Sequence, residues 1–158
     1  MARSGPIKVE ISPGELLDKI AILEIKAGRI ADPQKLAHVR HELGMLERAR
    51  DAFVPRPSVL SPLTGELRAV NEALWEIEDA IRAEEAAARF GPRFIVLARA
   101  VYRNNDRRAA IKKRINELLG SAIVEEMCYA GGVGEPASPP AEAPGAELVP
   151  ASPPPRQV

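Results

Sequence analysis

The sequence has few aromatic residues, one cysteine and no excess of charge of either sign. Aromatic residues make up only 4% of the 158 residues, so the core must consist of Leu, Ile, Val and Ala, which favours helices over sheets. The single cysteine, Cys128, excludes an intrachain disulfide and gives no sign of an oxidising compartment. Because 22 basic residues balance 22 acidic ones, the charge disfavours a protein whose whole surface binds nucleic acid or an anionic membrane.

Several familiar segments and motifs are also missing. No apolar run approaches the roughly 20 residues of a membrane span, and the first ten residues lack the apolar segment of a signal peptide, so we expect a cytoplasmic protein. No Walker loop, Rossmann glycine pattern, zinc-ligand spacing or Ser-His-Asp arrangement occurs. We therefore assign no catalytic residue, no metal and no cofactor, and the sequence leaves open whether the chain is an enzyme.

The composition divides the chain into two parts. Residues 131–158 hold eight of the fifteen prolines, four glycines and no aromatic residue. Such a segment cannot bury enough apolar surface to offset its ordering entropy. We predict a helical domain over residues 1–130 and a disordered, proline-rich tail over residues 131–158.

The first part of the domain carries clear start signals. Apolar residues alternate with polar ones over residues 7–11, which predicts a short strand or an extended arm. Ser12 is a good N-cap, Pro13 suits the first helical position, and Glu15 completes a capping box. Asp32 and Pro33 then begin a second helix, with an apolar face at Leu36, Val39, Leu43, Leu46 and Phe53. The short link predicts an antiparallel hairpin.

Two further helical stretches follow a proline-rich break at residues 54–62. In the first, apolar residues step alternately by three and four, the repeat of a coiled-coil-like seam; they are Leu60, Leu63, Leu67, Val70, Leu74, Ile77 and Ile81. Gly91 and Pro92 end this stretch, and the last helix runs from about residue 94 to 119. The fold class is therefore all-α, a bundle of four or five helices.

The first helix is apolar around most of its circumference. Such a helix is either central in the bundle or covered by a second subunit. On this ground we predict a homo-oligomer, most simply a dimer, formed through the first helix or through the seam of the third. A protein partner is the other possibility for this surface.

The stretch Arg103 to Asn116, "RNNDRRAAIKKRIN", allows two structures. The three-and-four spacing of inward-facing positions continues through this stretch without a shift. One continuous helix is therefore allowed, with Asn104 and Arg108 facing inward. Alternatively, Asn105 or Asp106 caps a new helix. In that case, cations in its first turn would oppose the helix dipole, as at an anion-binding site.

Two runs of opposite charge lie on the last two helices. Residues 72–85 contain six acids and one base, and residues 99–116 contain seven bases and one acid. The simplest hypothesis is that the two runs pair, with Arg108 reaching Glu78 or Asp79 under the cover of Trp75. A second hypothesis is a polar cleft between the helices near residues 71–82 and 99–116 that binds an anionic metabolite, such as a nucleotide or a sugar phosphate. Its anion-binding candidates are Arg99, Asn105, Arg108, Lys112 and Asn116, and its further cleft candidates are Asn71, Trp75, Asp79 and Tyr102.

Two other interpretations have less support. The "RRAAIKKR" face suggests nucleic-acid binding, which the neighbouring acids and the zero net charge disfavour. Glu15 and Asp18, with Glu72, Glu76 and Asp79, have the helical spacing of Mg²⁺ ligands. This faintly resembles the all-helical nucleotide pyrophosphohydrolases, but neither helix has their Glu-x-x-Glu motif.

Three segments together resemble a family of small bacterial proteins classed as a domain of unknown function. They are "PIKVEISPGELLDKIAILEIKAGRI", "VNEALWEIEDAIR" and "FIVLARAVYRNNDRRAAIKKRINELLGSAIVEE", and the resemblance covers about residues 6–129. It implies no reaction, but it implies an association with surface-polysaccharide synthesis beside glycosyltransferases. The chain departs from the family at Met127 and Cys128, where a Lys-Ser pair is expected. A non-catalytic interaction or accessory module is our first hypothesis, and the metabolite site is the alternative.

Overall fold

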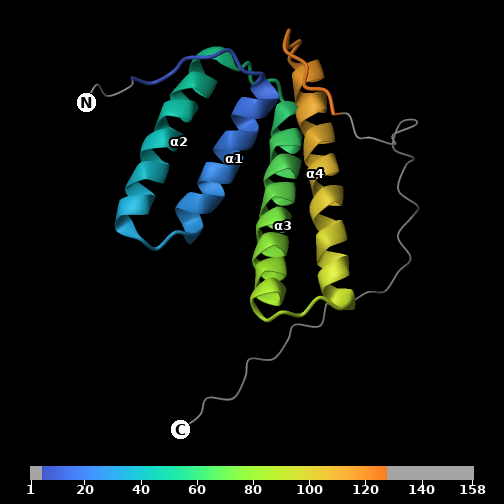
Figure 1. Cartoon of the computed structure of the whole chain (residues 1–158). Helices are drawn as coiled ribbons and strands as arrows, with labels where there is room; N and C mark the ends of the chain where they lie inside the picture. Colours follow the sequence, from blue (N-terminus) through green and yellow to red (C-terminus); the bar gives the residue numbers. More distant parts are fainter. Residues whose placement is uncertain (1–4, 128–158) are drawn as a thin grey trace. The chain divides into compact units, whose positions relative to one another are not determined.

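The computed structural model describes residues 5–127, and within them the chain forms four helices and no strand (Figure 1). The helices are α1 (Pro13–Arg29), α2 (Pro33–Phe53), α3 (Leu60–Ala86) and α4 (Pro92–Leu118). The all-α prediction is confirmed, with four helices rather than five. The predicted tail at residues 131–158 and the substitution at Cys128 lie outside the described residues.

The predicted strand at residues 7–11 is wrong, because residues 5–12 adopt neither strand nor helix. Ile7 and Val9 are 88% and 73% exposed, so the alternating apolar residues cover nothing within the described part of the chain. A strand needs a neighbour to satisfy its backbone groups, and no strand forms among residues 5–127. The segment therefore corresponds to the extended-arm alternative.

The helix starts follow the predicted capping. Ser12 Oγ accepts a hydrogen bond from the backbone N–H of Glu15 at 3.1 Å, and Asp32 Oδ1 accepts one from Lys35 at 2.9 Å. At α1, the described residues form only the hydrogen bond from the Glu15 N–H to Ser12 Oγ, which is one half of the predicted capping box. Among these residues the other half is absent, because the Glu15 carboxylate is turned toward Lys112 on α4. The start of α1 is thus tied to a helix about 100 residues further along the chain.

Helix α1 lies at the centre of the fold. It packs against α2, α3 and α4, whereas among the described helices α2 packs only against α1. The helices form two antiparallel hairpins, α1–α2 and α3–α4 (Figure 1). The chain itself therefore covers the wide apolar surface of α1, including Leu16, Leu17, Ile20, Leu23 and Ile25. A second subunit is not needed to explain that surface, so this ground for a dimer through α1 no longer holds.

The predicted seam of α3 also faces into the chain. Its first five members, Leu60 to Leu74, are buried, and most of them join a core with Ile111 and Ile115 of α4. Leu43 and Leu46 of α2 pack against the edge of this core, but Phe53 is 84% exposed and lies off the predicted face. The last two members of the seam, Ile77 and Ile81, are only half-buried.

The lower part of the α3–α4 hairpin continues beyond the end of α1 (Figure 1). Helix α1 ends at Arg29, whose guanidinium lies 5.5 Å from the ring centroid of Trp75 and pairs with Glu76. We call residues 76–104 the hairpin tip, and residues 60–75 with 105–118 the covered part. None of the described helices is long and apolar enough to cross a membrane.

Candidate functional site

The stretch Arg103 to Asn116 lies within one continuous helix, α4. The side-chain amides of Asn104 and Asn105 donate to the carbonyls of Ala100 and Val101, four residues earlier, at 2.8 and 3.1 Å. These bonds satisfy the amides without interrupting the helix. The alternative in which Asn105 or Asp106 begins a new helix is therefore wrong, and no helix N-terminus is available here for an anion.

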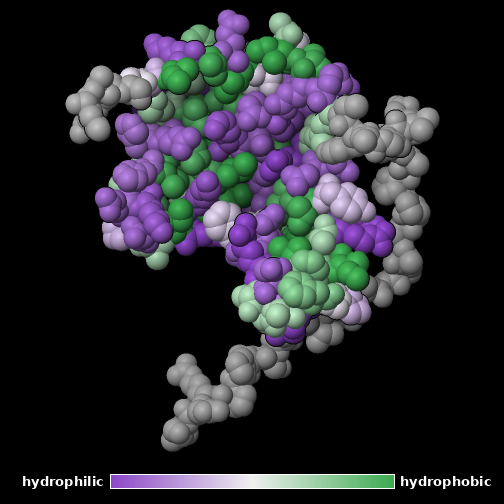
Figure 2. Space-filling model, viewed as in Figure 1, coloured by the Kyte–Doolittle hydropathy of each residue, from purple (hydrophilic) through white to green (hydrophobic). Residues whose placement is uncertain are grey.

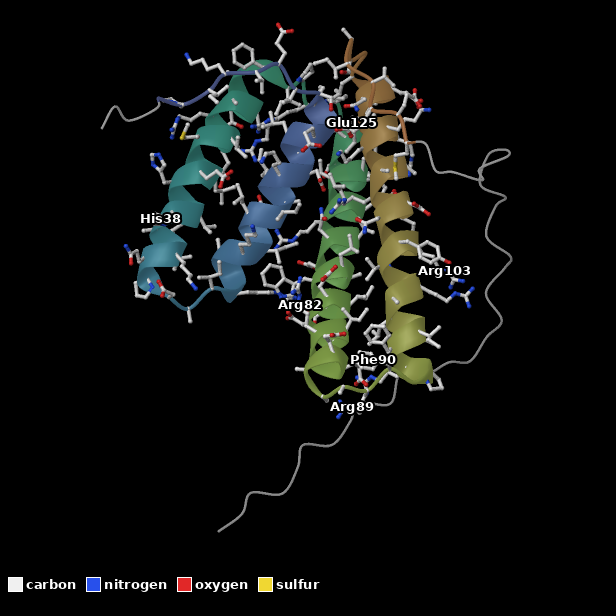
Figure 3. All side chains as sticks on the ribbon, in the orientation of Figure 1. His38, Arg82, Arg89, Phe90, Arg103 and Glu125 are labelled. Carbon is white, nitrogen blue, oxygen red and sulfur yellow. The ribbon has the colours of Figure 1, made fainter. Side chains whose placement is uncertain are left out.

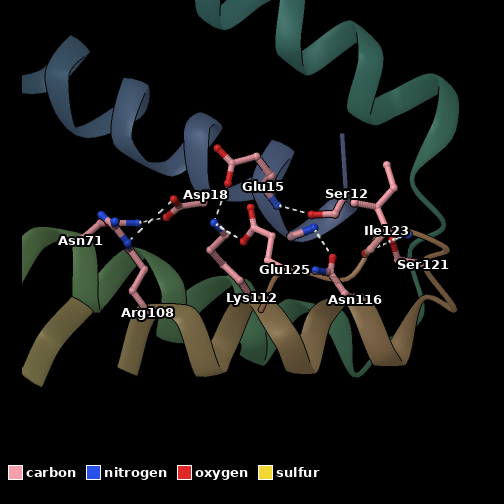
Figure 4. A network of polar contacts seen from close by, with 11 residues as sticks. Ser12, Glu15, Asp18, Asn71, Arg108, Lys112, Asn116, Ser121, Ile123 and Glu125 are labelled. Carbon is pink, nitrogen blue, oxygen red and sulfur yellow. Dashed lines mark hydrogen bonds and ion pairs between the residues drawn. The ribbon is translucent and has the colours of Figure 1, made fainter. Parts of the chain in front are cut away.

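Asp18 of α1 is the buried centre of the polar groups on this part of α4. Only 4% of the residue is exposed, and its Oδ1 accepts a hydrogen bond from Asn71 Nδ2 at 2.8 Å (Figure 4). Its Oδ2 lies 3.9 Å from Nε of Arg108. A buried carboxylate needs such partners, because an unpaired buried charge is costly. Arg108 thus pairs with Asp18, and not with Glu78 or Asp79.

Lys112, one turn further along α4, lies between two carboxylates. Its Nζ is 2.5 Å from Glu15 Oε2 and 2.7 Å from Glu125 Oε2 (Figure 4). The hydrogen bond from Lys112 lowers the pKa of Glu15 below its usual value of 4.5, although burial opposes this shift. Burial also acts to lower the pKa of Lys112, but the bonds to Glu125 and Glu15 outweigh it and raise that pKa above 10.5.

Asn116 fastens the start of α1 to α4. Its Oδ1 accepts a hydrogen bond from the backbone N–H of Gly14 at 2.7 Å. A Cβ atom at Gly14 would lie 2.7 Å from the carbonyl oxygen of Lys112 and 2.8 Å from Asn116 Oδ1, so only glycine fits here without a shift. This contact satisfies one of the free N–H groups at the start of α1.

These contacts form one set, which we call the α1–α4 polar network: Ser12, Gly14, Glu15, Asp18, Asn71, Arg108, Lys112, Asn116 and Glu125. No buried side-chain nitrogen or oxygen among residues 5–127 lacks a hydrogen-bond partner. Satisfied buried networks of this kind fix how helices pack. In the described chain, the network's cations are engaged by the chain's own carboxylates.

The structure therefore places some of the nine residues predicted for the metabolite cleft in the polar network and the others outside it. Four of them, Asn71, Arg108, Lys112 and Asn116, are brought together in the polar network. The other five are Trp75, Asp79, Arg99, Tyr102 and Asn105, which lie apart from that network. As a binding site, the set of nine stays a prediction.

Each of the five has other surroundings. Trp75 lies beneath Arg29, Asp79 is exposed on the tip, and the amide of Asn105 is bound to its own helix. Tyr102 is exposed between Arg99 and Arg103, which lower its pKa by hydrogen bonds, Arg99 first. Figure 3 shows Arg103 on the side of α4 that faces away from α3.

The two charged runs do not pair with each other in the described part of the chain. The ion pairs of the acidic run go to Arg29, Arg68, Arg82, Arg89 and Arg93. Those of the basic run go to Asp18, Glu15, Glu125 and Glu66. Sequence reasoning missed that α1 supplies the inner carboxylates. The available signal was Asp18 itself, a charge set among apolar residues of a helix that is apolar nearly all round.

The arrangement gives the Mg²⁺ interpretation no support. Within residues 5–127, no three His, Cys, Asp or Glu side chains gather in a way that could hold a metal ion. Glu15 and Asp18 face cations, and Glu72 and Glu76 pair with arginines.

Comparisons with known proteins give a family but no activity. No curated protein matches the chain, and no solved structure matches it. The model of one family, described as a family of unknown function (DUF6165), matches residues 7–146. This range covers all four helices and every member of the polar network. The chain belongs to this family of unknown function, DUF6165.

Proposed function

We propose that the chain is a non-catalytic interaction module that docks through its hairpin tip. The observation that carries this proposal is the apolar surface of the tip, where α1 no longer covers α3 and α4. Phe90, Ile95 and Val96 are 56%, 54% and 66% exposed, and Ile77 and Ile81 are half-buried beside them. Figure 2 shows apolar residues gathered at this lower end of the hairpin. Clustered apolar exposure of this kind is typical of interaction surfaces.

The polar network supports the same proposal from the other end of the hairpin. An anion-binding cleft needs cations that are available to a ligand. Arg108 and Lys112 instead contact Asp18, Glu15 and Glu125, and these contacts hold α1 against α4. The network therefore acts in the packing of the helices, whereas the exposed apolar residues of the tip are open to a partner.

The partner that best fits the tip is a second copy of this chain. Asp79 and Glu85 on α3, and Arg99 and Arg103 on α4, have no partner of opposite charge among the ion pairs of the described residues. One hairpin thus carries unpaired acids on one helix and unpaired bases on the other. A two-fold axis through two such tips would place acidic α3 against basic α4 twice and bury the apolar residues between them.

The resemblance of the sequence points further, to a role as an accessory of glycosyltransferases in surface-polysaccharide synthesis. In that role, a dimer of tips would hold two copies of the module together, and the α1–α2 hairpins would remain available on the outside. The three sequence segments that resemble the family support this role.

Sedimentation velocity of the full chain over a range of concentrations tests the self-association. We expect a concentration-dependent dimer. The double substitution Ile95→Ser/Val96→Ser should raise its dissociation constant at least about tenfold, since about 1.4 kcal/mol of apolar contact would be lost. Both positions are exposed, so the fold should be unaffected.

Phe53→Ser is the matched control, because Phe53 is also an exposed apolar residue but lies on α2, away from the tip. It should leave the dimer unchanged. A chain that sediments as a monomer at every concentration, or a dimer that survives the double substitution, would overturn the proposal.

A further inference from the structure

A cavity of about 620 Å³ lies away from the polar network, between α1, the end of α2 and the start of α3. Its volume is within the range of small-molecule sites, roughly 300–1,000 Å³. The apolar part of its lining is aliphatic and comes from Leu17, Ile20, Ala21, Val54 and Leu60. No aromatic residue lines it, so it offers no surface on which a nucleobase or a sugar ring could stack.

The polar part of the lining is mainly basic or hydroxylic. Arg50, Arg56 and Arg68 line the cavity with one acid, Glu24, and three hydroxyl residues, Ser58, Ser61 and Thr64. Arg68 contacts Glu24 at 2.8 Å and Glu72 at 3.0 Å, so two carboxylates surround this one guanidinium and the Arg68 end of the cavity is not positive. Arg50 and Arg56 differ, because both contact the same carboxylate, that of Asp51. Two guanidiniums that share one carboxylate leave a net positive charge at their end of the cavity.

The loop and the helix at this end favour an anion as well. Pro55 and Pro57 restrict the backbone of the loop that carries Arg56. Helix α3 begins beside it with Val59 at the N-cap position, and no side chain caps the first turn. The dipole of α3 therefore adds to the positive potential of the two arginines.

A glycine, Gly65, lies on the cavity wall. Gly65 is within α3, where glycine costs about 1 kcal/mol relative to alanine. A Cβ atom built there meets no other atom within 4 Å. The local packing does not require a glycine, unlike the packing around Gly14, but a large side chain here would occupy space at the cavity.

We propose that this cavity binds an aliphatic anion, with the carboxylate or phosphate head at Arg50 and Arg56 and the hydrocarbon body against Leu17, Ile20 and Val54. The recognised chemistry is a single anionic group on an aliphatic chain. The site is separate from the hairpin tip, and it does not depend on the interaction function proposed above.

Amide chemical shifts of the ¹⁵N-labelled full chain, titrated with three eight-carbon probes, test this proposal. Octyl phosphate and octanoate carry the two candidate heads, and octanol has the same body without charge. We expect saturable shifts at Ser61, Thr64 and Gly65 with both anions, at a Kd below about 1 mM, and binding of octanol at least about tenfold weaker. The tighter of the two anions identifies the head group.

Gly65→Leu should abolish these shifts, and it should not lower the melting temperature, because leucine is the better helix former. The matched control is Gly28→Leu, which replaces an equally open helical glycine of α1 outside the cavity and should leave binding intact. Arg56→Gln should weaken both anions about three- to tenfold without affecting octanol. The proposal is overturned if neither anion shifts these amides, if octanol binds as tightly, or if Gly65→Leu still binds.

Discussion

The α3–α4 hairpin is a single pair of helices with two different environments. In the covered part, α1 lies against both helices, and Leu67 and Ile115 are almost completely buried. In the tip, α1 reaches only as far as Glu76, which pairs with Arg29, and beyond it no described helix covers α3 and α4 (Figure 1). Ile77, Ile81 and Leu97 are only half-buried there, although they continue the same three-and-four spacing. The apolar pattern is thus similar in both parts, and the burial is not.

This difference shows which apolar residues pack within the chain and which remain available for docking. Two helices cannot bury an apolar stripe by themselves, because part of each stripe still faces solvent. In the covered part, α1 supplies the missing layer together with the carboxylates that balance Arg108 and Lys112. In the tip, that layer must come from outside the described chain or stay absent. Substitutions in each part test whether the covered part contributes more to the free energy of unfolding than the tip does.

The largest expected difference concerns two apolar residues of α4. Ile115→Ala in the covered part should lower the free energy of unfolding by about 4 kcal/mol, because the side chain is 0% exposed and its removal leaves a cavity. Leu97→Ala in the tip should cost about 1 kcal/mol, because solvent already reaches the half-buried side chain. Urea unfolding followed by circular dichroism measures both changes. Equal losses would mean that the tip is packed as tightly as the covered part, for example by a second subunit under the conditions of the measurement.

The sequence predicted where the helices lie in the chain better than it predicted which neighbours pack against them. Spacing and capping residues located all four helices, since Ser12, Asp32 and the prolines act on neighbouring backbone groups. The same spacing could not tell where α3 loses its third neighbour, because that depends on the length of α1 and on how far it extends along the hairpin. The alternation at residues 7–11 misled for a similar reason, since a strand also requires a partner that local pattern does not reveal.

A smaller difference is expected between two aspartates. Asp18→Ala should lower the free energy of unfolding by about 2–3 kcal/mol, because it leaves buried Asn71 without its acceptor and Arg108 without its carboxylate. Asp79→Ala, at an exposed position on the tip, should change it by less than about 0.5 kcal/mol. The same urea titrations measure both. A near-zero effect of Asp18→Ala would mean that the polar network does not hold α1 in place, and Arg108 would again be available to a ligand.

The candidate site was predicted only in part, and the reason is again the position of α1. Asn71, Arg108, Lys112 and Asn116 were among nine residues predicted to line one cleft, and helical spacing does put Arg108, Lys112 and Asn116 on one face of α4. Their partners Glu15 and Asp18 come from a helix whose orientation the sequence did not give. The cavity near Gly65 was missed entirely, since its lining comes from three segments and from a loop with no regular pattern.

The smallest expected effect is the pH dependence of the carboxylates in the two parts. Lys112 holds the pKa of Glu15 below 4.5 in the covered part, and a hydrogen bond from Arg89 likewise lowers the pKa of Glu84 in the tip. A carboxylate with a lowered pKa in the folded state stabilises the fold above its unfolded pKa, and this contribution is lost as the pH falls through the folded value. Lys112 keeps its charge throughout this range, because its pKa is raised above 10.5.

Glu15→Gln should therefore reduce the loss of stability between about pH 7 and pH 3, by less than about 1 kcal/mol because Glu15 is partly solvated. Glu84→Gln should reduce the loss in the same direction, because Arg89 lowers the pKa of Glu84. Urea midpoints at the two pH values measure each variant against the unmodified chain. If Glu15→Gln has the same profile as the unmodified chain, Lys112 does not hold Glu15 in solution, and the link between α1 and α4 depends on Asp18 and Asn116 instead.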